Sequence, residues 1–470
     1  MKVALINPPQ LLPKSWGKPT VWQNLGLMYI ASVLQKEGHE VKVIDAVAID
    51  WEEPIEMGQF YYSGMRIPDI LKELRRFGSE IVGISSPFTV NSKVVDQLAY
   101  QSKTALPDAK VVLGGADITA RANEYKDFDY ADFIVIGEGE NVVKEITLSQ
   151  EKMLKKDFIQ NLDEIPFPSR ELFPMEEYFK AYDKGRACRH NYLFHRRWTN
   201  IVCTRGCPYN CVFCSIHLSM GRKFRKRSVK NIETEINELV NGKLKIKHIN
   251  FEDDNISLEK DFFIKLLHMM IRNDYDITWS LPNGIRADTL NEEIVKKMAE
   301  VGCKRVFVAP ESGVQRVVNE VIHKNLDLTT VERAVKLFKK HRIIVDVAFV
   351  IGLVGETKKD ILDSIRYAEK LKKLGAEEAG FGIATPLYGT ELRSQAVSKS
   401  YIPRNLDCSK LSPFESVIST EEWDSEWMLK IRDFASWYVS KPLWRKLLSI
   451  GKMLLSDTDK ALDFIRFWWS

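Results

Sequence analysis

The sequence from Cys203 to Cys214 is CTRGCPYNCVFC, which places four of the seven cysteines within twelve residues. Cys207, Cys211 and Cys214 have the spacing C-x3-C-x2-C and follow directly after a predicted strand at residues 200–202. Three thiolates on one loop can bind three irons of a cubane, which leaves the fourth iron open to a small molecule. The pattern therefore predicts a [4Fe–4S] cluster held by these three cysteines.

A structural zinc site is the main alternative for the cysteine loop. Such a site closes four ligands around one ion, and Cys203 or His217 could supply the fourth. Zinc ligands usually come as two separated pairs, so the spacing favours the iron–sulfur cluster. We expect Cys203 to lie outside the ligand set. The scattered cysteines Cys188, Cys303 and Cys408 are expected to behave as small hydrophobic residues.

The cysteine loop belongs to a region in which strands and helices alternate. Helical patterns such as 228–241 and 329–341 separate apolar runs that are typical of buried strands. The predicted strands are residues 200–202, 248–251, 278–280, 305–309, 345–351 and 378–383. This alternation indicates a parallel sheet. Six strands suit a partial barrel, which we assign to residues 196–400, rather than a complete eight-stranded one.

The first 145 residues show the same alternation and predict a doubly wound parallel sheet. A predicted helix at residues 25–36 ends at Gly38. The predicted strands are residues 3–6, 41–44, 81–85, 111–113 and 133–136. Glycines follow the last two strands, at the sheet edge where such folds bind ligands. The fold class is therefore α/β, with an N-terminal domain at residues 1–145.

Two further segments have different compositions. Residues 146–195 are punctuated by prolines and are predicted to be a linker. Residues 401–470 are predicted to be a helical C-terminal region, broken at Pro442, that acts as core or as a lid. This region contains six of the eleven tryptophans, namely Trp423, Trp427, Trp437, Trp444, Trp468 and Trp469.

Composition excludes several classes of protein. The chain has 68 basic and 64 acidic residues, a net charge of only +4, which gives no reason to expect a nucleic-acid partner. No apolar run approaches the ~18 residues that span a bilayer, and the apolar start MKVALIN is too short for a signal peptide. We expect a cytoplasmic protein without membrane contact, and interfacial binding through the basic, tryptophan-rich C-terminal region is the alternative. The basic run at residues 222–227 is expected to be a solvated loop, with an anionic substrate as the alternative partner.

The stretch from Cys203 to Cys214 resembles the signature of the radical S-adenosylmethionine (SAM) superfamily. In that family the open iron chelates the amino and carboxylate groups of SAM. One electron from the cluster then cleaves the sulfonium and gives a 5′-deoxyadenosyl radical, which abstracts hydrogen from the substrate. The resemblance implies that Phe213 lies near the adenine. It also implies an external electron donor, such as flavodoxin or ferredoxin.

Later segments match the same family in the right order, at the ends of the second, fourth and fifth strands of the domain. The implied SAM contacts are Glu252, Asp253, Glu311, Ser312, Gly352 and Gly355. The first two match by position only, because the glycines of the family's Gly-Gly-Glu segment are absent. The others lie in segments like the family's Glu-Ser-Gly and Gly-x-x-Gly-Glu. The ordered set argues against a metal or cobalamin carrier without enzymatic activity.

The N-terminal domain resembles the cobalamin-binding domain that precedes many radical SAM modules. The implied cobalamin contacts are Pro8, Gly114, Gly115, Gly137 and Gly139. Glycines let the corrin and its nucleotide tail approach the backbone closely. The loop at residues 7–13 lacks the cobalt-binding histidine of cobalamin mutases, so we expect no protein histidine below the cobalt. A flavodoxin-like domain kept only as a scaffold is the alternative.

The combined resemblance implies a cobalamin-dependent radical SAM methyltransferase. In such an enzyme one SAM gives the radical, and another supplies the methyl group that methylcobalamin hands to an unactivated carbon. The alternative is a radical SAM cyclase, C–C coupling enzyme or lipid-modifying enzyme that uses no cobalamin. The substrate is a small molecule, a lipid or a peptide.

Overall fold

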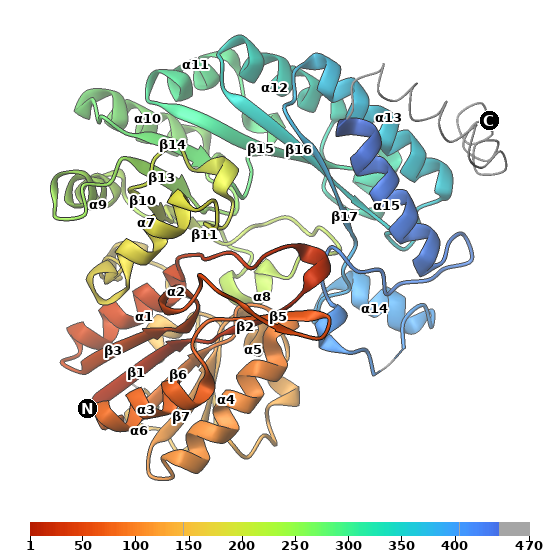
Figure 1. The fold of residues 1–470 in the computed structure, drawn as a ribbon. Helices are drawn as coiled ribbons and strands as arrows, with labels where there is room; N and C mark the ends of the chain where they lie inside the picture. The colour runs from red at the N-terminus through yellow and green to blue at the C-terminus, as the bar shows by residue number, and fades with distance from the viewer. Residues whose placement is uncertain (144, 404, 441–470) are drawn as a thin grey trace.

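The computed structural model describes residues 1–143, 145–403 and 405–440, and it contains two six-stranded sheets. In Figure 1 the N-terminal sheet and its helices lie below an arch formed by the second sheet and its outer helices. The predicted α/β architecture, a doubly wound sheet followed by a partial barrel, is confirmed.

The N-terminal sheet has the order β3-β1-β6-β7-β8-β9, and all of its pairs are parallel. The strands are β1 (Lys2–Asn7), β3 (Glu40–Asp45), β6 (Ile81–Ser85), β7 (Lys110–Gly114), β8 (Phe133–Ile136) and β9 (Met153–Lys155). Five of these strands were predicted. The sixth strand, β9, lies in the predicted linker. Its three residues are too few to show the alternation of apolar and polar residues that indicates a strand. The sheet therefore extends beyond residue 145.

Helices cover both faces of this sheet. Val3 and Leu5 of β1 pack into one apolar cluster with α1 (Leu25–Lys36), whereas Ala4 and Ile6 pack with α3 (Ile67–Phe77) and α4 (Ser92–Ala105). The shorter helices are α2 (Ala46–Ile49), α5 (Ala116–Ala120) and α6 (Glu145–Leu148). Because successive strand residues face opposite sides, the continuous apolar run of β1 is buried on both.

A small antiparallel sheet was not predicted. It has the order β2-β5-β4, with strands β2 (Gln10–Pro13), β4 (Ile55–Met57) and β5 (Phe60–Ser63). Its strands lie in the connections that follow β1 and α2. Each is too short to show a clear alternation of apolar and polar residues.

The second sheet keeps its strands in chain order, and each neighbouring pair is parallel. The strands are β10 (Trp198–Ile201), β13 (His248–Phe251), β14 (Thr278–Leu281), β15 (Cys303–Glu311), β16 (Ile344–Ile351) and β17 (Ala379–Ile383). The outer helices are α9 (Val229–Asn241), α10 (Lys260–Asn273), α11 (Glu292–Glu300), α12 (Leu328–Lys340) and α13 (Lys358–Leu374). All six strands were predicted.

The linker contains α7 (Met175–Asp183), and α14 (Glu391–Ser398) lies at the end of the barrel segment. The C-terminal region contains α15 (Ser425–Ser440). Helix α15 packs against β17, and Trp423 just before it is buried. Pro442, Trp444, Trp468 and Trp469 lie outside the described residues. Among the helices that the structure describes, none is long and apolar enough to cross a membrane.

Candidate functional site

A two-stranded hairpin closes the base of the cysteine loop. Strand β11 (Thr204–Arg205) pairs antiparallel with β12 (Arg225–Lys226), so the intervening residues 206–224 form one closed loop that includes α8 (Ile216–Met220). Gly206 has a φ of 85°, and a Cβ there would collide with the Lys223 carbonyl oxygen. Glycine is therefore required where the loop leaves the hairpin.

The three predicted cluster ligands share this loop and carry free thiols. Cys207, Cys211 and Cys214 are half-buried, and burial raises the pKa of all three thiols, that of Cys214 to about 12. The cations of Lys324 and Arg286 act in the opposite direction on Cys207 and Cys211. Ligation of iron requires thiolates, so cluster binding must release protons here.

The arrangement suits a cubane better than a single ion. Within residues 1–143, 145–403 and 405–440, no group of three or more His, Cys, Asp or Glu side chains is gathered around one metal ion. Cysteines that bind a cubane hold three different irons and stand further apart than the ligands of one ion. Three free thiols on one loop fit that requirement.

Cys203 occupies a different environment from the three ligands. Its side chain is fully buried, and burial raises the pKa of its thiol well above the usual range. We expect Cys203→Ala to cost about 1 kcal/mol of stability, as for a small buried truncation, and to keep the iron content of the wild type. Iron analysis after anaerobic reconstitution measures this, with Cys214→Ala as the depleted control. Loss of iron in Cys203→Ala to the level of that control would refute the assignment.

Asp253, a predicted SAM contact, is a buried acceptor for the start of the cysteine loop. Its carboxylate accepts hydrogen bonds from the Cys203 and Thr204 backbone N–H groups, at 3.0 and 2.6 Å, and from the Thr204 hydroxyl at 2.6 Å. Burial raises the pKa of Asp253 to about 7. The structure gives Asp253 a positioning role, and its contact with SAM stays a prediction.

Glu252 and Asp254 flank Asp253 and differ from each other. Glu252 faces Arg189 from the linker at 3.4 Å, and Arg189 also donates to the Asn283 side chain. Asp254 has no hydrogen bond or ion pair with any described residue, although its charge raises the pKa values of Cys207 and Cys214. The Asp254 carboxylate is open to solvent yet surrounded by protein, which raises its pKa to about 6. The sequence analysis missed this free carboxylate beside the cysteine loop.

The remaining predicted SAM contacts lie at the ends of β15 and β16. Glu311 pairs with Lys324 at 2.7 Å, and Ser312 lies 3.0 Å from the Ser364 hydroxyl of α13. The turn at Gly352 and Gly355 is closed by another carboxylate. All of these predicted contacts therefore lie at or just after the ends of strands of the second sheet. Phe213, in the cysteine loop, is half-buried against the barrel core.

Glu356 closes the turn after β16. It accepts hydrogen bonds from the N–H groups of Gly352 and Leu353, at 2.8 and 3.0 Å, and burial raises its pKa to about 8. Gly352 and Gly355 have φ values of 87° and 97°, which only glycine adopts without strain. The glycines of this segment are therefore explained by the backbone, and their contact with adenine stays a prediction.

A cavity of about 970 Å³ lies between the two sheets. The glycine turns after β7 and β8 line it on one side, and Ser215, Ser219 and Met220 of the cysteine loop line it on the other. The predicted cobalamin contacts among its lining residues are Gly114, Gly115, Gly137 and Gly139. Pro8 is buried and lies outside the lining.

The cavity also extends along the face of the N-terminal sheet beneath α1. Leu5 of β1, Gly83 of β6 and Leu34 of α1 line this extension. A Cβ on Gly115 would lie 2.6 Å from the Ser86 carbonyl oxygen, and one on Gly139 would lie 2.7 Å from Ile30 Cδ1. The cavity therefore reaches from the glycine turns at the strand ends to the sheet face beneath α1, and both regions are available to cobalamin, a macrocycle with a tail.

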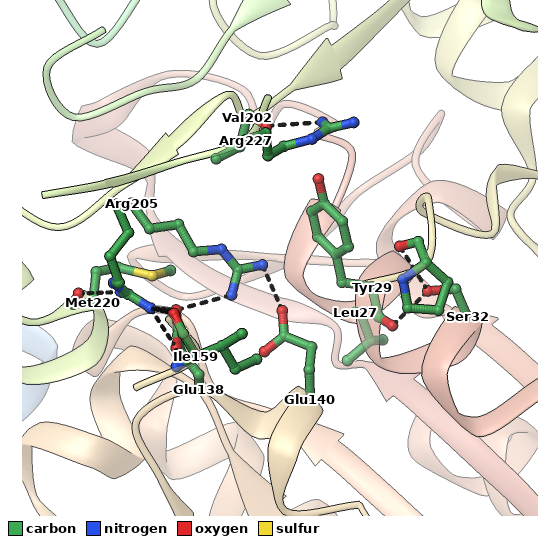
Figure 2. A network of polar contacts seen from close by, with 12 residues as sticks. Leu27, Tyr29, Ser32, Glu138, Glu140, Ile159, Val202, Arg205, Met220 and Arg227 are labelled. Carbon is green, nitrogen blue, oxygen red and sulfur yellow. Dashed lines mark hydrogen bonds and ion pairs between the residues drawn. The ribbon is translucent and has the colours of Figure 1, made fainter. Parts of the chain in front are cut away.

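The basic run at residues 222–227 is split between surface and interior, so the expectation of a solvated loop is wrong for two of its members. Arg225 and Arg227 are buried, and they pair with Glu138 and Glu235 at 2.8 and 2.5 Å. Figure 2 shows Arg227 donating to the Val202 carbonyl oxygen, and Arg225 is held separately at the turn after β8 by Glu138. These two arginines form buried ion pairs within the protein and are therefore not available to bind an anionic substrate.

Comparison with known proteins agrees with this geometry. Residues 201–368 match the Radical SAM superfamily, and residues 19–147 match the B12 binding domain. An uncharacterized methyltransferase of Pyrococcus horikoshii is 30% identical, with 99% of this chain and 96% of that protein covered. Cytidylyl-2-hydroxyethylphosphonate methyltransferase of Streptomyces wedmorensis is 28% identical, with 90% and 87% covered.

Among solved structures, the radical SAM methyltransferase TsrM from Kitasatospora setae has the same fold. It aligns with a TM-score of 0.63 at 17% identity, over 94% of this chain and 89% of its own. The chain belongs to the radical SAM superfamily, among the enzymes of that superfamily that carry a B12-binding domain. Its cofactors are accordingly a [4Fe–4S] cluster, SAM and cobalamin, which confirms the cofactors predicted from the sequence.

Proposed function

We propose that this enzyme transfers a methyl group from SAM, by way of cobalamin, to an unactivated carbon of a small molecule. The observation that carries the proposal is the single cavity that the glycine turns of the B12-binding domain and the cysteine loop share. Two similar proteins named as methyltransferases, which align over nearly the whole chain, support it.

The residues of this chain supply the framework of the reaction. When bound, the cluster provides the electron that cleaves SAM, and cobalamin carries the methyl group. Cys207, Cys211 and Cys214 hold the cluster, while Asp253 fixes the backbone where their loop begins. A carboxylate at a strand end would hold the amino group of SAM beside the cluster.

Asp254 is the carboxylate that we assign to the amino group of SAM. It lies close enough to the cysteine loop to affect Cys207 and Cys214, and it has no partner in the described part of the chain. Glu252 and Asp253 already have protein partners. A carboxylate pairs well with an ammonium group, because charge-assisted hydrogen bonds are the stronger class.

We expect Asp254→Asn to weaken SAM binding about 10- to 100-fold, as expected for the loss of a charge-assisted hydrogen bond. The carboxylate carries its charge above its pKa of about 6, so the SAM affinity of the wild type should fall as pH drops through that value. Equilibrium binding of SAM to the reconstituted protein across pH measures both effects. Asp261→Asn, on the outer helix α10, is the matched control. Unchanged affinity in Asp254→Asn would contradict the assignment.

The B12-binding domain offers no histidine at the carboxyl ends of its strands, where the corrin would lie. His39 lines the cavity but precedes β3, at the opposite edge of the sheet. A six-residue strand separates the two edges by about 20 Å. We therefore propose that His39 makes no axial bond to cobalt.

We expect cob(II)alamin in this protein to show no hyperfine splitting from a protein nitrogen below the cobalt. Electron paramagnetic resonance of the loaded wild type measures it, and His39→Ala should give the same spectrum. Axial-nitrogen splitting that disappears in His39→Ala would refute the claim.

The cavity wall favours a substrate with an apolar surface. Trp16, Trp22, Phe88, Tyr388 and Phe414 line it. Its two arginines, Arg189 and Arg205, are already paired with carboxylates, and among the described lining residues no other Arg or Lys occurs. We infer a small molecule that presents an apolar carbon to the cavity.

A flavodoxin or ferredoxin is the electron donor that we propose.

Anaerobic reconstitution followed by analysis of iron, sulfide and cobalt tests the cofactor content. We expect about four irons, about four sulfides and about one cobalt per chain. A protein that takes up iron and sulfide but retains no cobalt under any loading condition would exclude the cobalamin-dependent reaction.

A further inference from the structure

We propose that Glu138 is a positioning residue that ties the cobalamin-binding turn to the loop that holds the cluster. The inference rests on the proposed function, because it concerns how the two cofactors are held relative to each other. Glu138 lies in the turn after β8, between Gly137 and Gly139, and all three residues line the cavity.

The Glu138 carboxylate is buried and receives donors from three separate segments. Arg205 Nη1 lies 3.0 Å from Oε1, and Arg225 Nη1 lies 2.9 and 2.8 Å from the two oxygens. The backbone N–H of Ile159 donates to Oε2 at 2.7 Å. Figure 2 shows Arg205 reaching Glu138 and Glu140.

The two arginines stand at the two ends of the cysteine loop. Arg205 and Arg225 face each other across the β11–β12 hairpin, immediately before and after residues 206–224. One carboxylate of the B12-binding domain therefore holds both ends of the loop that carries Cys207, Cys211 and Cys214. Glu140, from the same turn, adds a second ion pair to Arg205 at 2.6 Å.

A buried ion pair within one sheet serves as a comparison. The bidentate pair of Arg305 and Asp346, at 2.6 and 2.9 Å, joins the neighbouring strands β15 and β16 of one sheet. The Glu138 network instead joins two domains, and its two arginines balance the charges of its two glutamates. A shift of the cobalamin-binding turn must therefore move the base of the cluster loop with it.

The test compares Glu138→Gln with Asp346→Asn as the matched control, both in the full-length chain. The first readout is hydrogen–deuterium exchange of residues 206–224 before cofactor loading. The second is the partition of SAM, in the loaded protein, between S-adenosylhomocysteine and 5′-deoxyadenosine. Both variants are expected to have lower thermal stability than the wild type, because each disturbs a buried ion pair.

We expect Glu138→Gln to speed exchange in residues 206–224 about tenfold, because the segment loses its charged anchor. We also expect it to lower the share of S-adenosylhomocysteine about tenfold, while 5′-deoxyadenosine formation persists. Asp346→Asn should leave both readouts at the wild-type level. Glu140→Gln, which leaves Glu138 in place, should change loop exchange and the share of S-adenosylhomocysteine in the same direction but by a smaller factor. This variant replaces Glu138→Gln in the test if Glu138→Gln does not fold.

Equal loop exchange in Glu138→Gln and in the control would overturn the proposal, and so would an unchanged partition of SAM. If the loaded wild type itself forms no S-adenosylhomocysteine, the methyl-transfer function fails. The exchange comparison would then still decide whether Glu138 holds the loop.

Discussion

The triple variant with Cys207→Ala, Cys211→Ala and Cys214→Ala is expected to contain no [4Fe–4S] cluster and to form no 5′-deoxyadenosine. In our proposal each of these thiolates binds a different iron, so the triple variant lacks every protein ligand of the cluster. Iron and sulfide analysis, visible absorption and product analysis after anaerobic reconstitution measure the loss.

Cys303→Ala is the control for this triple variant. Cys303 is a lone buried cysteine at the start of β15, far along the chain from the loop, and its removal should leave the cluster intact. Retention of about four irons per chain in the triple variant would mean that the cluster has other ligands.

The second large effect is expected for Gly83→Phe, which should abolish the retention of cobalamin. Gly83 lies in β6 and lines the extension of the cavity beneath α1. A Cβ at this position would already lie 2.9 Å from Leu5 Cδ2, so an aromatic ring has to enter the space that we assign to the cobalamin tail. We expect cobalamin binding to fall about 100-fold, because overpacking at the upper end of its usual cost, about 3 kcal/mol, corresponds to a loss of that size.

Cobalt content after desalting, together with a thermal melt and the iron content, measures the effect of Gly83→Phe. The cluster should be unaffected, because Gly83 lies in the other domain. Gly83→Ala is the matched control and should keep cobalamin, because the end of the Leu5 side chain can shift. Wild-type cobalamin retention in a folded Gly83→Phe protein would show that the tail lies elsewhere.

Strands rich in apolar residues could be predicted because the residues themselves indicate burial. Strands β6 and β8 have the predicted bounds, and so does β13, in which apolar residues alternate with His248 and Asn250. Strand β9 and the β11–β12 hairpin could not be predicted, since they are two or three residues long and exist only through pairing with segments distant in the chain.

The burial of two arginines in the basic run could not be predicted from the sequence, because the three residues RKR at 225–227 are all basic. Arg225 and Arg227 are buried while Lys226 between them is exposed. This alternation has the period of two that is typical of a strand with one buried face. Buried arginines at that period indicate ion pairs across an interface rather than a solvated loop.

The acidic segment after β13 was predicted in part. Its position at a strand end identified it as a site, but the sequence does not reveal which carboxylate is free. Asp253 turns to the backbone of Cys203 and Thr204, whereas Asp254 is left without a partner in the described structure. Only the tertiary hydrogen bonds distinguish the two.

Product analysis of SAM in the reconstituted enzyme tests the central claim, methyl transfer by way of cobalamin, most directly. The protein is loaded with the cluster, with and without cobalamin, and incubated anaerobically with a reductant and SAM carrying a deuterated methyl group. The account predicts 5′-deoxyadenosine in both samples. It predicts S-adenosylhomocysteine, with transfer of the labelled methyl group to the reduced cobalamin, only in the sample that contains cobalamin. Formation of 5′-deoxyadenosine alone, at the same rate in both samples, would contradict it.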